Sequence, residues 1–120
     1  PSQSNGKKTE PNNVITFDEF QNVELKTAKV LEAEKVEGAD KLLKLQIEVG
    51  DEKKQIISGI AQHYSTENLI GKMIVVVTNL KPATIFGLES YGMLLAAKKG
   101  KDLTLITIDG EKVKSGMKIY

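Results

Sequence analysis

The sequence has no cysteine, no arginine and only one histidine, and its apolar runs are short. Without cysteine the chain can form neither a disulfide nor a thiolate zinc site, and His63 alone cannot build a multi-histidine metal site. An apolar run such as residues 73–77 falls far below the roughly 18 residues that a membrane-spanning helix needs. We therefore expect no metal and no cofactor, and interpret the chain as a soluble, intracellular protein without a membrane partner.

The lack of arginine restricts how the chain could recognise an anion. All 17 basic residues are lysines, and with 16 acidic residues they give a formal net charge of +1. A lysine ammonium is a point charge and lacks the planar fork that reads a base edge through two hydrogen bonds. The near-zero net charge favours a modest, shape-dependent contact over tight, indiscriminate binding to nucleic acid.

Aromatic residues are also scarce, with three Phe and three Tyr. Two of the Phe lie close to the N-terminus and Tyr120 is the last residue, so the predicted strands offer no platform for stacking bases. The sequence thus favours folded RNA, recognised by its shape and phosphates, over unpaired bases.

No catalytic constellation emerges from the sequence. The glycine spacing at residues 87–92 resembles a phosphate-binding loop, but Met93 and Leu94 stand where that loop needs Lys and Ser or Thr. His63 lies beside Tyr64 at a predicted helix start, where a capping or surface role is expected. We predict that this chain contains no catalytic residue.

The chain divides into a polar tail and one domain. Residues 1–13 carry no large apolar side chain and are interpreted as a disordered linker or tail, and residues 14–120 as a single domain. Thr16 and Glu19 have the spacing of a capping box, which predicts a short helix with Phe17 and Phe20 on one side.

Period-two alternation dominates the domain. At 43–49 apolar residues alternate with Lys44, Gln46 and Glu48, as in a half-buried strand. In the first strand the apolar phase changes between Thr27 and Ala28, which predicts a bulge and a strong bend. Further strands are expected at residues 53–57, 73–79, 93–97, 103–108 and 117–120, with a short helix at 65–69.

This pattern predicts an all-β fold, a five-stranded Greek-key barrel of the oligonucleotide-binding (OB) type. It would carry a short N-terminal helix, a short helix between strands three and four, and extra C-terminal strands, although an open sandwich would satisfy the same alternation. On such a barrel a lysine set could form a surface that tracks a nucleic-acid backbone: Lys41, Lys44, Lys53, Lys54 and Lys81.

Over residues 15–120 the sequence resembles the tRNA-binding domain found at the C-terminus of methionyl-tRNA synthetases and in free-standing dimeric tRNA-binding proteins. Four blocks carry the resemblance, in the same order and spacing: "ADKL" at 39–42, "SGI" at 58–60, "NLKPA" at 79–83 and "ESYGM" at 89–93.

The resemblance implies a non-catalytic, cytoplasmic domain that forms a homodimer and binds tRNA by shape and phosphate contacts. It would be joined to the catalytic part of the synthetase through the N-terminal linker and would raise its affinity for tRNA. By motif position Lys41 would contact phosphate, Ser90 and Met93 would line the RNA-facing surface, and Asn79 and Lys81 would assist. The alternative is a free-standing dimeric tRNA-binding or chaperone-like peptide-binding module.

The sequence departs from the family at the last two blocks. Tyr91 stands where the family often has Gln, and residues 83–86 carry no basic residue where the family often places Lys or Arg. An exposed Ile85–Phe86 pair would invite aggregation, so we predict that both side chains are tucked against the barrel or a dimer partner.

Overall fold

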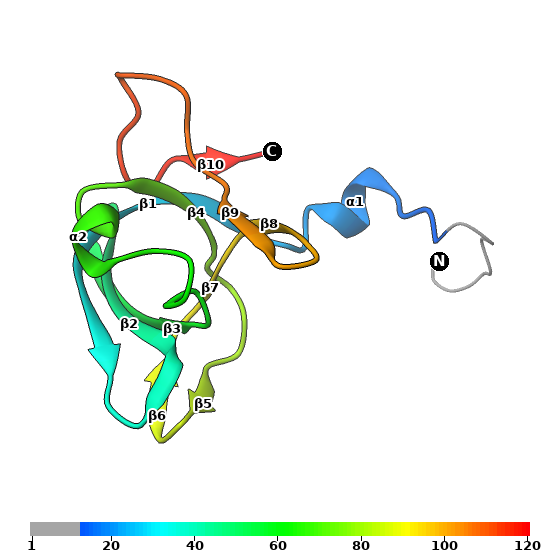
Figure 1. Ribbon diagram of the computed structural model, residues 1–120. Coiled ribbons are helices and arrows are strands. Elements are labelled where there is room, and N and C mark those ends of the chain that lie inside the picture. The colour runs from blue at the N-terminus through cyan, green and yellow to red at the C-terminus, as the bar shows by residue number, and fades with distance from the viewer. Residues whose placement is uncertain (1–12) are drawn as a thin grey trace.

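The computed structural model describes residues 13–120, so the predicted linker lies, except for Asn13, outside the described residues. Figure 1 shows a strongly bent sheet that curls into one body, with the first helix projecting away from it. The elements are, in chain order, α1 (Phe17–Phe20), β1 (Leu25–Val36), β2 (Ala39–Val49), β3 (Glu52–Ser58), α2 (Thr66–Leu69), β4 (Met73–Val77), β5 (Ala83–Ile85), β6 (Leu88–Ser90), β7 (Met93–Leu94), β8 (Ala96–Lys99), β9 (Asp102–Leu105) and β10 (Lys118–Ile119).

The main sheet is antiparallel and has the order β3-β2-β1-β4-β7, with β10 added beside β1. The long β1 serves both halves of the sheet, because Lys29 to Val36 pair with β2 while Leu25 to Lys29 pair with β4. β5–β6 and β8–β9 are separate hairpins. The predicted all-β, OB-like fold with extra C-terminal strands is confirmed, although the strand ladders alone leave the sheet open between β7 and β3.

Hydrogen bonds outside the ladders join these two edges. The Tyr91 N–H donates to the Gln55 carbonyl at 2.8 Å. The Gln55 side chain donates in turn to the Glu89 carbonyl at 2.9 Å, and the Ile57 N–H donates to Ser90 Oγ at 3.0 Å. Residues 89–91 therefore dock on β3 and bring the open edges together.

The alternation predicted in β2 is confirmed: Leu43, Leu45, Ile47 and Val49 are buried and point to the interior. They pack with Ile56 from β3, Leu69 from α2 and Ile74 from β4. One face of the curled sheet thus supplies the core, which leaves the alternate residues of β2 and the first part of β3 on the outer face. Ile57 at the end of β3 is buried as well, where residues 89–91 dock.

Both predicted helices are present, and each begins at the expected capping residue. Thr16 Oγ1 accepts from the Glu19 N–H and the Glu19 carboxylate accepts from the Thr16 N–H, which completes the capping box. Ser65 accepts from the Asn68 N–H at 3.2 Å. Neither helix within residues 13–120 is long and apolar enough to cross a bilayer.

The bulge in β1 was predicted at the wrong place. Pairing with β4 runs without interruption from Leu25 to Lys29, and the register with β2 shifts between Val30 and Glu32. Thr27 and Ala28 are both buried for a different reason. Ala28 belongs to the core cluster, whereas Thr27 is covered by the C-terminal segment.

The strand pattern after β4 is finer than the sequence indicated. Residues 80–92, where no strand was expected, contain the β5–β6 hairpin. The strand expected at 93–97 is divided between β7 and β8, and that expected at 103–108 is β9, followed by a single bridge between Thr107 and Ile74. These strands are short, and a period of two is weakly expressed over two to four residues.

Thr27 anchors the C-terminal segment to the barrel. Its hydroxyl donates to the Lys114 carbonyl at 2.5 Å and accepts from the Met117 N–H at 2.9 Å. The Gly116 N–H donates to the Thr27 carbonyl at 2.7 Å. Gly116 thereby lies directly against Gly50 in the turn between β2 and β3. We call residues 114–119 the C-terminal strap.

Candidate nucleic-acid interface

Two connections meet at one end of the body, where Figure 1 shows the β5–β6 hairpin beside the β1–β2 turn. In OB-folds the strands two and three, with the loops 1–2 and 4–5, form the surface that binds oligonucleotides. Here the loops correspond to the turn around Gly38 and to residues 78–92. A hollow of about 290 Å³ lies between them, and we call it the loop hollow. Its lining is Glu34, Lys35, Val36, Glu37, Lys44, Phe86 and Leu88.

A second, larger hollow of about 840 Å³ follows the outer face of β1, β2 and β3. We call it the outer groove. It shares Glu34 and Lys44 with the loop hollow, so the two form one continuous surface. Acidic and basic groups are balanced along it, which suits a modest electrostatic contact. Its lining is Leu31, Glu32, Ala33, Glu34, Lys44, Gln46, Lys53 and Ile70.

The predicted lysines do not share one surface. Lys44 and Lys53 lie together in the outer groove, and Lys44 forms an ion pair with Glu34 at 2.5 Å. Lys54 alternates with Lys53 along β3, so it points to the opposite face, and its charge contributes to lowering the pKa of Glu24. Lys41 at the start of β2 and Lys81 after β4 are exposed.

Ser90 is placed in the interior and not on the surface where it was expected. Its side chain is 4% exposed. The hydroxyl accepts from the Ile57 N–H at 3.0 Å and donates to the Gly92 carbonyl at 3.1 Å. Ser90 therefore helps to close the sheet, and its contact with RNA stays a prediction. Met93, by contrast, is half exposed at the start of β7.

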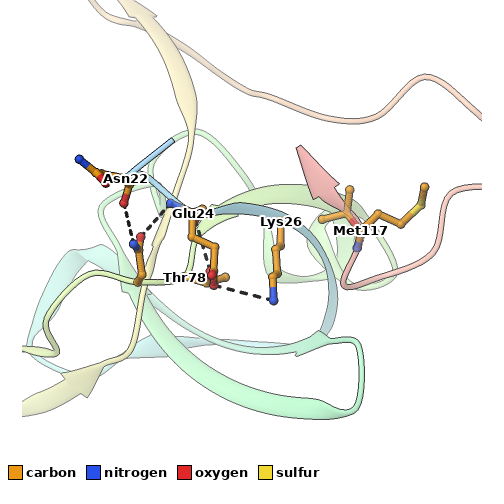
Figure 2. A network of polar contacts seen from close by, with 7 residues as sticks. Asn22, Glu24, Lys26, Thr78 and Met117 are labelled. Atoms are coloured by element: carbon orange, nitrogen blue, oxygen red, sulfur yellow. Dashed lines mark hydrogen bonds and ion pairs between the residues drawn. The ribbon is translucent and has the colours of Figure 1, made fainter. Parts of the chain in front are cut away.

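Asn79 holds the segment before β1 against the end of β4; Figure 2 shows Asn22 and Glu24 of that segment beside Thr78. Its Oδ1 accepts from the Glu24 N–H at 2.9 Å, and its Nδ2 donates to the Asn22 carbonyl at 2.8 Å. Thr78 contributes a hydroxyl hydrogen bond to the Glu24 carboxylate. That bond, with a smaller contribution from Lys26 at 3.8 Å, lowers the pKa of Glu24 below its ordinary value. These side chains fix where β1 begins.

Comparison with known proteins identifies the family. The family described as "Putative tRNA binding domain" matches residues 25–118. The chain belongs to this tRNA-binding domain family.

The relatives of this tRNA-binding domain include much longer proteins. It is 59% identical over 107 residues to the methionine–tRNA ligase of Thermotoga maritima, covering 89% of this chain but 17% of that protein. The match is thus to about one sixth of the ligase.

Solved structures share the fold along nearly their whole length. The MetRS-related protein from Pyrococcus horikoshii has a TM-score of 0.81 at 36% identity, covering 90% of this chain and 99% of that one. The chaperone CsaA from Bacillus anthracis has a TM-score of 0.81 at 28% identity, covering 89% and 99%. The resemblance read from the four sequence blocks is confirmed.

Sequence reasoning missed two features of the tRNA-binding domain. Ile85 and Phe86 were expected to be tucked against the barrel or a dimer partner; Ile85 is half-buried, whereas Phe86 at the tip of the β5–β6 hairpin is 59% exposed in the single chain, and its contact with a partner stays a prediction. Glu34 was not singled out, although it joins both hollows and pairs with Lys44. The glycine at position 87 could have indicated a hairpin turn, because glycine is preferred at the second position of a two-residue hairpin loop.

Potential metal and catalytic groups are sparse in the described part of the domain. Residues 13–120 contain no group of three or more His, Cys, Asp or Glu side chains arranged to hold a metal ion. His63 is exposed beside a shallow hollow on the loop that leads into α2.

Proposed function

We propose that this chain is a non-catalytic domain that binds tRNA and adds affinity to the catalytic part of a methionyl-tRNA synthetase. The family match together with the 59% identity to a segment making up 17% of a methionine–tRNA ligase supports this assignment. The role would place the chain in the cytoplasm, with the N-terminal segment as the connection to the synthetase. A second tethered contact raises the local concentration of tRNA without any chemistry of its own.

The lysines provide the electrostatic part of the proposed contact. Lys41, exposed at the start of β2, is our first candidate for a phosphate contact, and Lys44, Lys53 and Lys81 extend the basic positions around the loops and the outer groove. Met93 offers an exposed apolar contact. Ser90, Asn79 and Lys54 are engaged or directed elsewhere, so we expect them to influence RNA binding through the shape of the barrel.

Replacing Lys41 with alanine should weaken tRNA binding in a salt-dependent manner. One lost phosphate contact reduces the slope of log K against log [salt] by about 0.7–0.9. Filter binding of tRNA at several salt concentrations measures this slope. Lys101→Ala, an equal change of charge in the exposed turn between β8 and β9, should leave the slope unchanged.

The outcomes of this experiment have separate meanings. An unchanged slope for Lys41→Ala would remove Lys41 from the interface while leaving the function intact. Failure of the wild-type chain to bind tRNA even at low salt, combined with binding to unfolded polypeptide, would favour the chaperone-like alternative. The chaperone CsaA of the same fold is 28% identical, against 59% for the ligase, so the tRNA assignment has priority.

We also propose that the chain forms a homodimer through the exposed arm that precedes β1. Figure 1 shows α1 standing apart from the body, and an exposed apolar surface of this kind is typical of an interaction site. A second copy would cover it. The exposed apolar residues of this arm are Val14, Ile15, Phe17 and Val23.

Sedimentation equilibrium should give about twice the chain mass of 13.2 kDa. Phe17→Glu places a charge on the arm and should yield the monomer, because burying an unpaired carboxylate is strongly unfavourable. Ile70→Glu is a matched control, since Ile70 is also exposed but follows α2 on the opposite side of the body from α1. A monomeric wild type at micromolar concentrations would contradict the dimer.

A further inference from the structure

We propose that Phe86 stacks on an unpaired nucleobase inserted into the loop hollow. This inference rests on the proposed RNA-binding function and specifies the part of the ligand that this end of the domain receives. It differs from the expectation drawn from composition, which favoured folded RNA without base contacts. A single aromatic ring at the tip of the β5–β6 hairpin, and not a platform on the strands, would make this contact.

The backbone at Phe86 indicates that the ring has a role beyond folding. Phe86 and Gly87 form the two-residue loop between β5 and β6, with φ of +51° and +77°. Positive φ at both positions is the type I′ geometry, for which Asn-Gly and Asp-Gly are strongly preferred. A phenylalanine is unfavourable at the first position. Such strain is concentrated at binding and active sites, where the surrounding structure maintains it.

The ring is held in place at its edge while much of its surface stays free. Its edge lies next to Gly38 in the β1–β2 turn, with Cζ at 3.4 Å from where a Cβ of residue 38 would be. The side chain is nonetheless 59% exposed. A larger residue at position 38 would crowd the ring, and Gly38 also has a positive φ of +86°. The glycine at position 38 therefore leaves room for the ring against the β1–β2 turn.

The hairpin that carries Phe86 is fixed at its base. Thr84 Oγ1 donates to the Glu89 carboxylate at 2.8 Å, and the Glu89 carbonyl accepts from Gln55 on β3 at 2.9 Å. Anchoring the hairpin to the barrel reduces the conformational entropy that a ligand must remove on binding. The ring is thus preorganised for stacking.

The chemistry of the loop hollow favours a base over a phosphate. Val36 and Leu88 give it apolar surface. Its two carboxylates, Glu34 and Glu37, are matched by two lysines, and Lys44 is already paired with Glu34, so the hollow has no excess positive charge to hold an anion. Lys35 also lines the hollow, and its flexible ammonium can reach a backbone phosphate outside. A neutral planar base fits inside the hollow, and its phosphate can lie outside, beside Lys35.

The size of the hollow points the same way. At about 290 Å³ it lies at the lower limit for small-ligand sites. It suits one planar group better than an extended peptide. Stacking on an aromatic ring is open to any base, because every base has a π-face.

The test uses a hexamer of adenosine nucleotides in which one base is 2-aminopurine, whose fluorescence is quenched on stacking. The wild-type chain and Phe86→Trp should bind the hexamer and quench it. Phe86→Asn removes the ring but supplies a residue preferred in the turn, so its thermal stability should not fall. Its affinity for the hexamer should decrease by about 5- to 100-fold, and the quenching should disappear. Tyr120→Ser, at the most exposed aromatic residue, should behave as wild type.

Each result decides between alternatives. Unchanged affinity and quenching for Phe86→Asn would overturn the stacking proposal, while a salt-dependent tRNA contact through Lys41 would leave the proposed function standing. Loss of binding to tRNA and hexamer alike in the wild type would reject both. If Phe86→Asn instead weakens binding to a permanently unfolded polypeptide and not to the hexamer, the loop hollow receives an apolar side chain and the base assignment is wrong.

Discussion

Replacing Gly116 with alanine is expected to detach the C-terminal strap and destabilise the domain by about 2–5 kcal/mol. A Cβ at this position would lie 2.7 Å from both the Cα and the N of Gly50. The obstacle is backbone, which cannot rotate away as a side chain can. The φ of +86° at Gly116 adds conformational strain for any residue with a Cβ. Urea unfolding followed by circular dichroism measures the loss.

Gly110→Ala provides a control in the same part of the chain. A Cβ at Gly110 meets no atom within 4 Å, and its φ does not require glycine. Its free energy of unfolding should therefore change by less than about 0.5 kcal/mol. Amide exchange adds a local measure, because release of the strap should expose the N–H groups of residues 116 and 117, which donate to the carbonyl and the hydroxyl of Thr27. Equal stability of the two variants would contradict the close contact with Gly50.

Ser90→Ala is expected to reduce stability by about 1–3 kcal/mol, even without RNA. The substitution removes the acceptor of the Ile57 N–H, and Ile57 is buried, with 6% of its surface exposed. It also removes the donor to the Gly92 carbonyl. An N–H left unpaired in the interior loses its hydrogen bond with water and gains nothing in return. Thermal or urea unfolding of the RNA-free chain detects the effect.

The control for Ser90→Ala is Ser58→Ala, at the end of the same strand β3. Ser58 is only partly buried, and its replacement should have little effect on stability. If Ser90 contacted RNA alone, its alanine variant would unfold like the wild type and lose only affinity. A loss of stability measured in the RNA-free chain would establish Ser90 as part of barrel closure.

Features encoded by neighbouring residues were predicted well. The alternation from Leu43 to Val49 needs only the pleat of one strand, and the capping box of Thr16 and Glu19 needs only one helical turn. Both are local, so tertiary contacts had little opportunity to alter them. The OB-like fold class followed from the number and spacing of these strands, and the resemblance to a known family implied the same fold.

Features that depend on distant segments were missed. Thr27 is buried because residues about ninety positions later cover it. The apolar phase change at Thr27 and Ala28 therefore does not mark a bulge, which is why the bulge was predicted at the wrong position. Ser90 was interpreted from its motif as a surface residue, whereas its partner lies 33 residues earlier on β3. The exposure of Phe86 depends on a turn geometry that its own residue type disfavours, so propensity gave no indication of it.

The side chain of Asn79 determines which part of the domain would first resist a force applied to the upstream segment. Because it binds the backbone at both Asn22 and Glu24, a pull on the upstream segment is passed to the end of β4 before it reaches the pairing of β1 with β2. The upstream segment is thus attached beside the start of β1, whereas the loops around Phe86 lie beyond the other end of that strand, next to Gly38.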